Sequence, residues 1–299
     1  MRKILIIIIA IFTLSFFGCQ KNTEKPTVIL PGGSPLISVA EILEDTDYQI
    51  VSGPDLFPAE FKKQERDIII APIIVGTKLY IAGASNYKLH SIIGWGNLYI
   101  VSRSKINSLN ELADKKVVAF GENATPGIIL KTALGSVNAN LSFLAAVTDV
   151  VGPFKTKQFD YALISEPVLE RLISSSPNET FHVFDLSKVE GLPKIAQFGV
   201  FVNPTPTHKV GTKNFLSKIE RNVKKVNENP ETYANLIVPK FEALQAFTPE
   251  LLTNAIPRMN LEFVSSKNAK NDFLAFVNFL NSKNPNLIGG QVPNEGFYY

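Results

Sequence analysis

The sequence has 299 residues, of which 45% are hydrophobic and 19% are charged. This length suits one large domain or two of ordinary size, and the apolar content excludes a disordered chain, because burial of apolar surface can offset the conformational entropy. The single cysteine, Cys19, excludes an internal disulfide and every zinc site that needs several cysteines. The sequence therefore predicts a globular protein that is held together by core packing.

The N-terminus carries a short basic start, Arg2 and Lys3, followed by an uncharged apolar run at 4–17. A run of this length is typical of the core of a signal peptide and falls short of the roughly 20 apolar residues that a transmembrane helix needs. It ends in Gly18-Cys19, which resembles the lipobox of bacterial lipoproteins, although bulky phenylalanines precede the glycine.

In a lipobox the cysteine is lipidated and becomes the new N-terminus. We therefore expect a signal peptide at 1–18, a lipid anchor on Cys19, and a lipidated N-terminus and tether at 19–26. An ordinary cleaved signal peptide and an uncleaved anchor are the alternatives. Removal of residues 1–18 changes the formal charge from +3 to 28 basic against 27 acidic residues. Such a balance predicts no nucleic-acid partner.

From residue 27 onward, short apolar runs alternate with helical patterns, which is typical of an α/β protein with mostly parallel sheets flanked by helices. Strands are predicted at 27–30, 48–51, 67–71, 88–93, 97–101, 116–120, 141–145, 160–164, 182–184 and 199–202. After residue 203 the pattern predicts a helical C-terminal block, with helices at 214–227, 230–238, 240–246, 249–256 and 267–280.

So many strands indicate two sheets, and hence two lobes with a ligand between them. We expect the chain to cross between the lobes near 99–103 and again near 198–203. This division gives a discontinuous first lobe at 27–100 and 203–299 and a continuous second lobe at 101–202.

Three strand-to-helix turns carry helix-capping residues, and helix starts favour anionic or polar ligands through their unpaired N–H groups and dipole. Good capping by itself is the structural alternative at each of them. Their location after predicted strands favours ligand binding, because ligands of α/β proteins bind at strand ends. The candidate ligand-binding residues in these turns are Gly33, Ser34 and Pro35, then Thr125, Pro126 and Gly127, and finally Glu166.

A further turn contains Trp95, the only tryptophan, between two glycines and just before Asn97. Its indole is either a core side chain in a tight turn or an aromatic wall on which a ligand ring stacks. Thr77, after another strand end, is a candidate hydrogen-bond donor. A capping box at 108–111 is expected to be purely structural.

Motifs for catalysis and cofactor binding do not occur in the sequence. The three histidines, His90, His182 and His208, lack the spacing of a metal pair, and no nucleophile elbow, phosphate-binding loop or complete dinucleotide fingerprint occurs. The sequence thus predicts a binding protein without metal or cofactor, and not an enzyme.

Two segments resemble a known family. Residues 95–102 (WGNLYIVS), 106–118 (INSLNELADKKVV) and 125–127 (TPG) look like the middle of the substrate-binding proteins of bacterial ABC importers. Residues 159–167 (FDYALISEP) resemble a segment of the sulfonate, nitrate and thiamine-precursor (NMT1/THI5-like) group. The likeness spans roughly residues 27–205.

This resemblance implies a two-lobed type II periplasmic-binding-protein fold that closes over a solute and docks on an ABC permease with its ATPase. We expect a monomeric lipoprotein, exported and anchored on the outer face of the cell membrane. Two helix starts favour an anionic solute, whereas Trp95 favours a flat heteroaromatic ring. An envelope enzyme on the same fold and a surface or sensor lipoprotein with a degenerate cleft are the alternatives.

Overall fold

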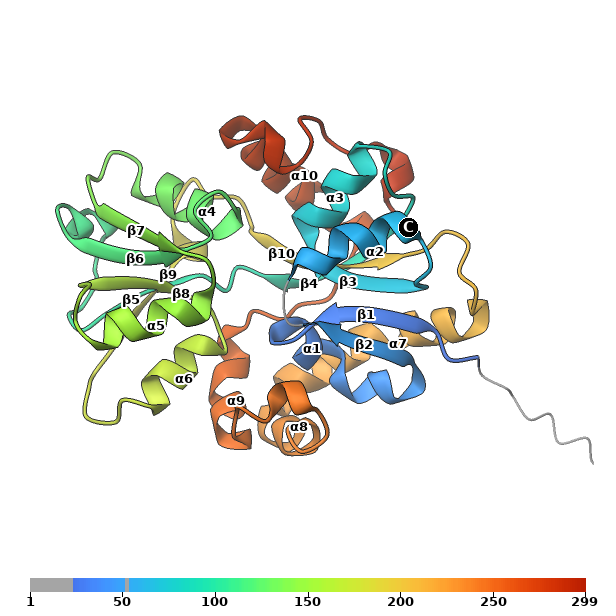
Figure 1. The fold of residues 1–299 in the computed structure, drawn as a ribbon, viewed down its shortest axis with the longest axis horizontal. Helices are drawn as coiled ribbons and strands as arrows, with labels where there is room; N and C mark the ends of the chain where they lie inside the picture. Colours follow the sequence, from blue (N-terminus) through green and yellow to red (C-terminus); the bar gives the residue numbers. More distant parts are fainter. Residues whose placement is uncertain (1–23, 52–53) are drawn as a thin grey trace, which may run out of the picture.

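The computed structural model describes residues 24–51 and 54–299 and contains two β-sheets, each flanked by helices (Figure 1). The first sheet has six strands in the order β11-β4-β10-β3-β1-β2. They are β1 (Thr27–Pro31), β2 (Asp47–Val51), β3 (Ile68–Pro72), β4 (Lys88–Trp95), β10 (Ala196–Val202) and β11 (Val264–Ser265). β1 is parallel to β2 and β3, whereas β10 is antiparallel to β3 and β4, and β11 is antiparallel to β4.

The second sheet has five strands in the order β7-β6-β8-β5-β9. They are β5 (Tyr99–Ser102), β6 (Lys116–Phe120), β7 (Asn140–Leu144), β8 (Tyr161–Ile164) and β9 (His182–Asp185). β6 is parallel to β7 and β8, and β5 is antiparallel to β8 and β9. Both sheets are therefore mixed, and the expectation of mostly parallel sheets was wrong, because direction depends on how distant strands pair.

Helices cover both faces of the first sheet. One face packs on α2 (Phe57–Lys63), α3 (Ile73–Ile81) and α10 (Ser266–Lys283), and the other on α1 (Ser34–Val39), α7 (Lys209–Glu228), α8 (Pro230–Ile237) and α9 (Pro249–Ala255). The second sheet is flanked by α4 (Thr125–Leu134), α5 (Val147–Lys155) and α6 (Val168–Ser174). The 3-10 turns are η1 (Ala40–Asp45), η2 (Pro54–Leu56), η3 (Leu109–Leu112), η4 (Leu186–Lys188), η5 (Glu242–Leu244), η6 (Ile256–Arg258), η7 (Pro285–Leu287) and η8 (Glu295–Phe297).

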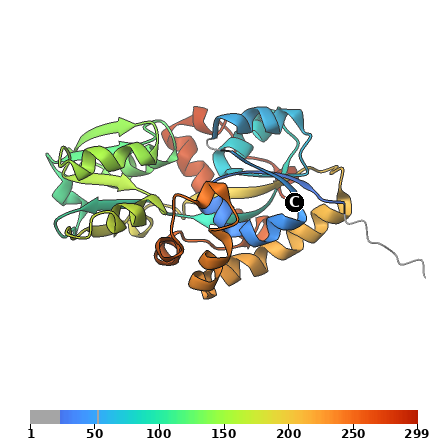
Figure 2. The same ribbon diagram turned by 60° about the horizontal axis from the view of Figure 1, so that its bottom comes forward.

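The central strands are apolar on both sides because both faces of the sheet are covered. In β1, Val28 and Leu30 pack into one cluster while Ile29 packs into the other, as the two-residue period of a strand requires. The helix α7 lies below the first sheet (Figure 2). Its buried stripe includes Phe215 and Ile219, which are spaced at helical intervals. Complete burial of such a side chain contributes about 1.5–3 kcal/mol to stability.

Strand pairing moves the predicted lobe boundaries. The expected crossings at 99–103 and 198–203 are strands within the sheets, β5 in the second and β10 in the first. The connections between the sheets are residues 96–98 and 186–195. We therefore define lobe 1 as the described part of 24–95 together with 196–299, and lobe 2 as 99–185. No local pattern indicates which sheet β5 or β10 joins, because an apolar strand can pair in either sheet.

All ten predicted strands are present with shifts of a few residues at their ends, and β11 was missed. The predicted helix at 240–246 contains only the 3-10 turn η5. Residues 24–26 of the predicted tether pack on the start of α7, where a side chain in place of Gly211 would meet the Glu24 carbonyl. The rest of the tether, Cys19 and the predicted signal peptide lie outside the described residues. Among the described residues, no helix combines the length and apolar character needed to cross a membrane.

Candidate functional site

Three predicted site residues from distant parts of the chain meet between the lobes. Ser34 begins α1 in lobe 1, Asn97 lies in the first connection, and Glu166 precedes α6 in lobe 2, and all three are buried. The Ser34 hydroxyl donates to the carbonyl oxygen of Glu166 at 3.3 Å. The structure thus brings together residues that the sequence predicted only as separate strand-end features.

Asn97 joins the other two residues. Its Nδ2 donates to the Glu166 carbonyl oxygen at 3.2 Å and to Ser34 Oγ at 3.4 Å, and its Oδ1 accepts from the Glu166 N–H at 2.7 Å. Asn97 has a φ of 58°, a left-handed conformation that asparagine tolerates better than most residues. The amide of Asn97 therefore fixes the loop before α6 to the connection between the lobes.

The Glu166 carboxylate binds a residue that sequence reasoning missed, Arg258 of η6 in lobe 1. Arg258 Nε lies 2.6 Å from Glu166 Oε1, and its second terminal nitrogen binds Glu170, one turn into α6. Glu170 N–H also donates to Glu166 Oε2 at 3.0 Å. No motif surrounds Arg258, and only tertiary folding brings it across the 92 residues that separate it from Glu166.

Burial dominates the electrostatics of this cluster. The Glu166 side chain is fully buried, and desolvation raises its pKa to about 6, although the nearby charge of Arg258 acts in the opposite direction. Tyr99 of β5 closes the cluster from lobe 2, since its hydroxyl donates to the Arg258 carbonyl oxygen and accepts from Asn260 Nδ2 at 3.2 Å. We call Glu166, Glu170 and Arg258 the interlobe triad.

A cavity of about 1030 Å³ lies at the carboxyl ends of β1, β2 and β3, beside the loop that leads to Ser34. It contains aromatic side chains, one lysine and one glutamate. Its lining residues are Pro31, Gly32, Gly33, Tyr48, Ile50, Val51, Phe57, Pro72, Lys240, Phe241, Glu242 and Ala243. Gly33, with a φ of 72°, is the N-cap of α1, so the cap is not Ser34 as predicted.

Trp95 is a buried side chain with several partners. Its Nε1 donates to the Glu262 carbonyl oxygen at 3.1 Å, and Lys194 Nζ lies 4.1 Å from the ring centroid. Trp95, Lys194, Asn260 and Glu262 are among the residues that line a second cavity, of about 540 Å³, at the connections between the lobes. The Trp95 ring is thus covered by a cation, which favours a structural role over that of an open stacking wall.

The start of α4 differs from its prediction. Ala124 is the N-cap, and Thr125 is the first helical residue and makes no capping hydrogen bond with its side chain. Pro126 follows in the first turn. A Cβ at Gly127 would lie 2.5 Å from the carbonyl oxygens of Gly121 and Glu122, so this glycine permits close packing of its own turn. No side-chain hydrogen bond or ion pair joins these three described residues to the interlobe triad.

Thr77 is buried within α3, and its hydroxyl donates to the Ile73 carbonyl oxygen at 2.7 Å. This bond joins Thr77 to the residue one helical turn before it, and it uses the hydroxyl that we expected to donate to a ligand. The capping box at Ser108 is present and structural, as predicted.

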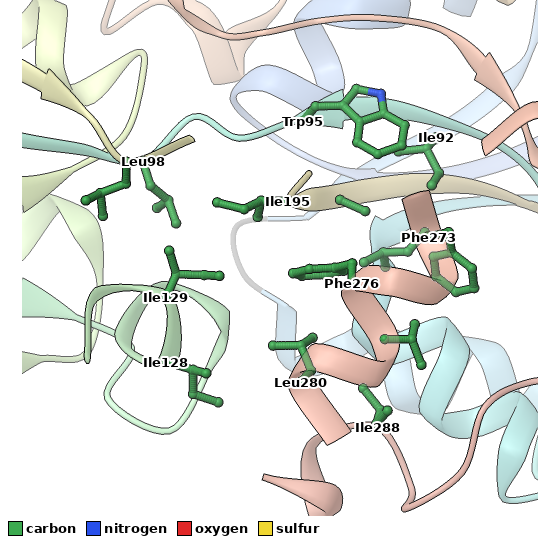
Figure 3. Close-up of a cluster of buried hydrophobic side chains, with 14 of the residues drawn as sticks. Ile92, Trp95, Leu98, Ile128, Ile129, Ile195, Phe273, Phe276, Leu280 and Ile288 are labelled. Carbon is green, nitrogen blue, oxygen red and sulfur yellow. The ribbon is translucent and has the colours of Figure 1, made fainter. Parts of the chain in front are cut away.

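Apolar side chains from both lobes form one buried cluster beside the connections (Figure 3). Leu98 lies on the first connection and Ile195 on the second, while Ile129 of α4 and Phe276 of α10 come from lobes 2 and 1. α4 contacts α10, and α6 contacts α9 on the side of the triad. The lobes are therefore packed on each other in this structure.

Several solved structures with a similar fold are described as components of ABC transporters. A structure described as an ABC transporter from Parabacteroides distasonis has a TM-score of 0.76 and 23% identity, covering 92% of this chain and 98% of its own. The periplasmic aliphatic sulphonate binding protein SsuA from Escherichia coli has a TM-score of 0.67 and 13% identity, covering 92% of both chains. The ligand-binding component of an ABC-type import system from Staphylococcus aureus, solved with zinc bound, has a TM-score of 0.63 and 12% identity, covering 91% of this chain and 97% of its own.

No protein-family model and no curated protein sequence matches the chain. The chain has the same two-lobed fold as these solved structures, which confirms the predicted two-lobed α/β fold and the predicted similarity to ABC substrate-binding proteins; the type II assignment and the NMT1/THI5-like subgroup stay predictions. The Escherichia coli and Staphylococcus aureus neighbours are described as a binding protein and a ligand-binding component, while for this chain the prediction of a binding protein stays a prediction. Among the described residues, no group of three potential metal-binding side chains occurs, in contrast to the zinc named for the Staphylococcus aureus protein.

Proposed function

We propose that this protein captures a small solute between its lobes and delivers it to an ABC importer. The observation that carries the proposal is the meeting of Ser34, Asn97 and Glu166, which come from lobe 1, the first connection and lobe 2. Loops at strand ends are the usual ligand sites of α/β proteins, and a site shared by two lobes couples binding to closure. The fold of the solved neighbours supports the same function.

The lobe 1 part of the solute-binding space that we propose is the 1030 Å³ cavity beside Gly32 and Gly33, whose lining residues all belong to lobe 1. Its volume is at the upper end of the range for small-molecule sites. Tyr48 and Phe241 lie on its wall and pack on each other as a tilted pair with ring centroids 5.9 Å apart, so they give the wall an aromatic surface against which a ring can pack. Lys240, the cation of the cavity, is paired with Glu44.

Charge distinguishes between the predicted classes of solute. Two carboxylates and one guanidinium give the interlobe triad a net charge of −1 when all three groups are ionised. None of the three residues lines the cavity, so this charge repels an anion only where the solute reaches from the cavity to the facing lobe. This balance favours a neutral or cationic heteroaromatic solute, such as a thiamine precursor-like pyrimidine, over a sulfonate. The sulfonate named for the Escherichia coli neighbour is the competing class.

The test combines identification of the solute with blockage of the cavity. Native mass spectrometry of the protein purified without refolding should find a small molecule, and thermal shift should rank pyrimidines above sulfonates. Gly32→Phe should abolish the shift, because a Cβ at Gly32 meets nothing within 4 Å and the ring enters the cavity. Gly152→Phe is the matched control, an open and exposed glycine of α5 in lobe 2. Binding that survives in Gly32→Phe rejects this location.

We also propose that the chain is exported and anchored through lipid on Cys19. The support is the apolar run at 4–17, the lipobox-like Gly18-Cys19 and the position of Glu24 at the surface of lobe 1. Cys19→Ala should move the protein from the membrane fraction to the soluble fraction while solute binding persists. Membrane association of the Cys19→Ala protein would instead indicate an uncleaved anchor.

The buried contact between the lobes favours a second candidate function, a surface or sensor lipoprotein whose cleft is closed by its own side chains. In that case no solute alters the distance between the lobes. The enzyme alternative has no comparable support: Arg258 and Glu170 bind the Glu166 carboxylate, and among the described residues no histidine or lysine does.

A further inference from the structure

The interlobe triad joins the lobes through charged groups. Glu166 and Glu170 belong to lobe 2, and Arg258 belongs to lobe 1. These contacts need no solute, because every partner is a residue of this chain. Tyr99, which binds the Arg258 carbonyl oxygen, and Ser34, which binds the Glu166 carbonyl oxygen, add two further bonds between the lobes.

We propose that the interlobe triad is a latch that closes the lobes on each other in the absence of solute, and that proton uptake by Glu166 tightens this closure. The first half follows from geometry. Arg258 binds both carboxylates at once, and such charge-assisted bonds are stronger than neutral ones.

The second half follows from the charge balance of the closed state. Two buried carboxylates face one arginine, whose side chain is 35% exposed. Arg258 and Glu170 are the charged groups that act on Glu166, and Tyr99 of β5, on which Asp185 of β9 also acts, supplies no positive charge. Closure therefore leaves one negative charge uncompensated, and a proton on Glu166 removes it.

Acidification should favour closure of the lobes, whereas it weakens a simple salt bridge. When the lobes open, water reaches Glu166 and its pKa returns toward the ordinary value of 4.5, whereas burial in the closed state raises the pKa to about 6. Closure thus takes up a proton between these pH values. The ratio of closed to open protein should rise about eightfold from pH 7 to pH 5.

The distance between the lobes can be measured with spin labels, because the chain from Gln20 onward contains every described element and no cysteine. Ser136→Cys in lobe 2 and Ser217→Cys on α7 provide two exposed labelling positions. Double electron–electron resonance on solute-free protein then gives the closed and open populations. We expect the closed population to increase on acidification to pH 5.

Variants of the triad separate the latch from other titrations. The lobes of Glu166→Gln should be at least as closed as those of wild type at pH 7, and their distance should no longer depend on pH. A pH response caused by histidines elsewhere would persist in this variant. Arg258→Met should open the lobes at both pH values. The proposal is overturned if the distance between the lobes in wild type does not change, or increases, on acidification. It is also overturned if the pH response persists in Glu166→Gln, or if the lobes stay closed in Arg258→Met.

Two outcomes require a replacement variant, Arg258→Lys. If wild type is fully closed at both pH values, the ratio is measured in Arg258→Lys, which keeps the charge but loses the two-pronged geometry; an unchanged ratio there contradicts the proton step. If Arg258→Met does not fold, Arg258→Lys also replaces it in the opening test, and lobes as closed as in wild type then contradict the latch. Because the solute is absent, failure of the latch leaves the solute-binding proposal intact.

Discussion

Replacement of Asp67 by asparagine tests the junction that holds the start of lobe 1 together. Asp67 is 1% exposed, and its carboxylate accepts four hydrogen bonds from Thr27 and His208. The shortest joins His208 Nδ1 to Asp67 Oδ2 at 2.7 Å. These bonds tie the first residue of β1, the residue before β3 and the residue before α7 at one point.

Asp67→Asn keeps the shape but turns one acceptor into a donor, so in either amide orientation at least one N–H of Thr27 or His208 faces another donor. An unsatisfied buried donor costs about 1–3 kcal/mol, and the remaining bonds weaken because their acceptor is no longer charged. We expect a loss of about 2–4 kcal/mol in the free energy of unfolding at pH 7.

Urea denaturation followed by circular dichroism measures this loss. Asp160→Asn is the matched control, because Asp160 is exposed at the start of another strand and its carboxylate accepts one backbone bond, from Lys116. The control should change stability by less than about 1 kcal/mol. Equal losses in the two variants would refute the reasoning.

The pH dependence provides a second check on Asp67. Burial raises its pKa, but the hydrogen bonds from Thr27 and His208 outweigh burial, and the pKa lies below its ordinary value of 3.8. A carboxyl with a lowered pKa stabilises the fold fully above about pH 4, and this contribution disappears as the pH falls through the pKa of the folded state. The difference between wild type and Asp67→Asn should therefore shrink in acid, opposite in sign to the effect of Glu166.

Three further predictions concern packing. Gly127→Ala should lower the free energy of unfolding by about 1–3 kcal/mol, because the added Cβ would clash with two carbonyl oxygens. The loss is measured as a lower midpoint of urea unfolding, and the control Gly152→Ala should show no comparable loss. Ile219→Ala should cost about 2–5 kcal/mol, since Ile219 is fully buried under the first sheet, and a smaller loss would show that α7 does not pack as described. Trp95 fluorescence should resist quenching by iodide in the native protein, because Trp95 is 3% exposed; efficient quenching would contradict its burial.

The helix starts favour one class of solute, whereas the net charge of the triad and the aromatic wall of the cavity favour another. Helix starts at α1 and α4 suggested an anion. However, α1 is only six residues long, and the hydroxyl of its first residue, Ser34, already donates to the backbone carbonyl of Glu166. The aromatic wall formed by Tyr48 and Phe241 now carries the case for a ring. The thermal-shift ranking of pyrimidines against sulfonates decides between them.

Local rules predicted local features. The residue types at Ser108 and Glu111 make a capping box in any context, because its bonds lie within four residues, and the structure contains it. The same rules failed at Ser34 and Thr125, where Gly33 and Ala124 are the caps. A serine or threonine before proline can cap a helix or begin it, and the surrounding chain selects one.

The sequence alone determined the alternation of strands and helices, the two-sheet class, and the strand-end loops where Ser34, Asn97 and Glu166 lie, because hydrophobic period and turn residues act over a few positions. Tertiary structure alone decided that β10 belongs to the first sheet, that the sheets are mixed, and that Arg258 meets Glu166. Those features depend on pairing and charge contacts between residues far apart in the chain, and no local pattern specifies which distant partner a strand or an arginine will find.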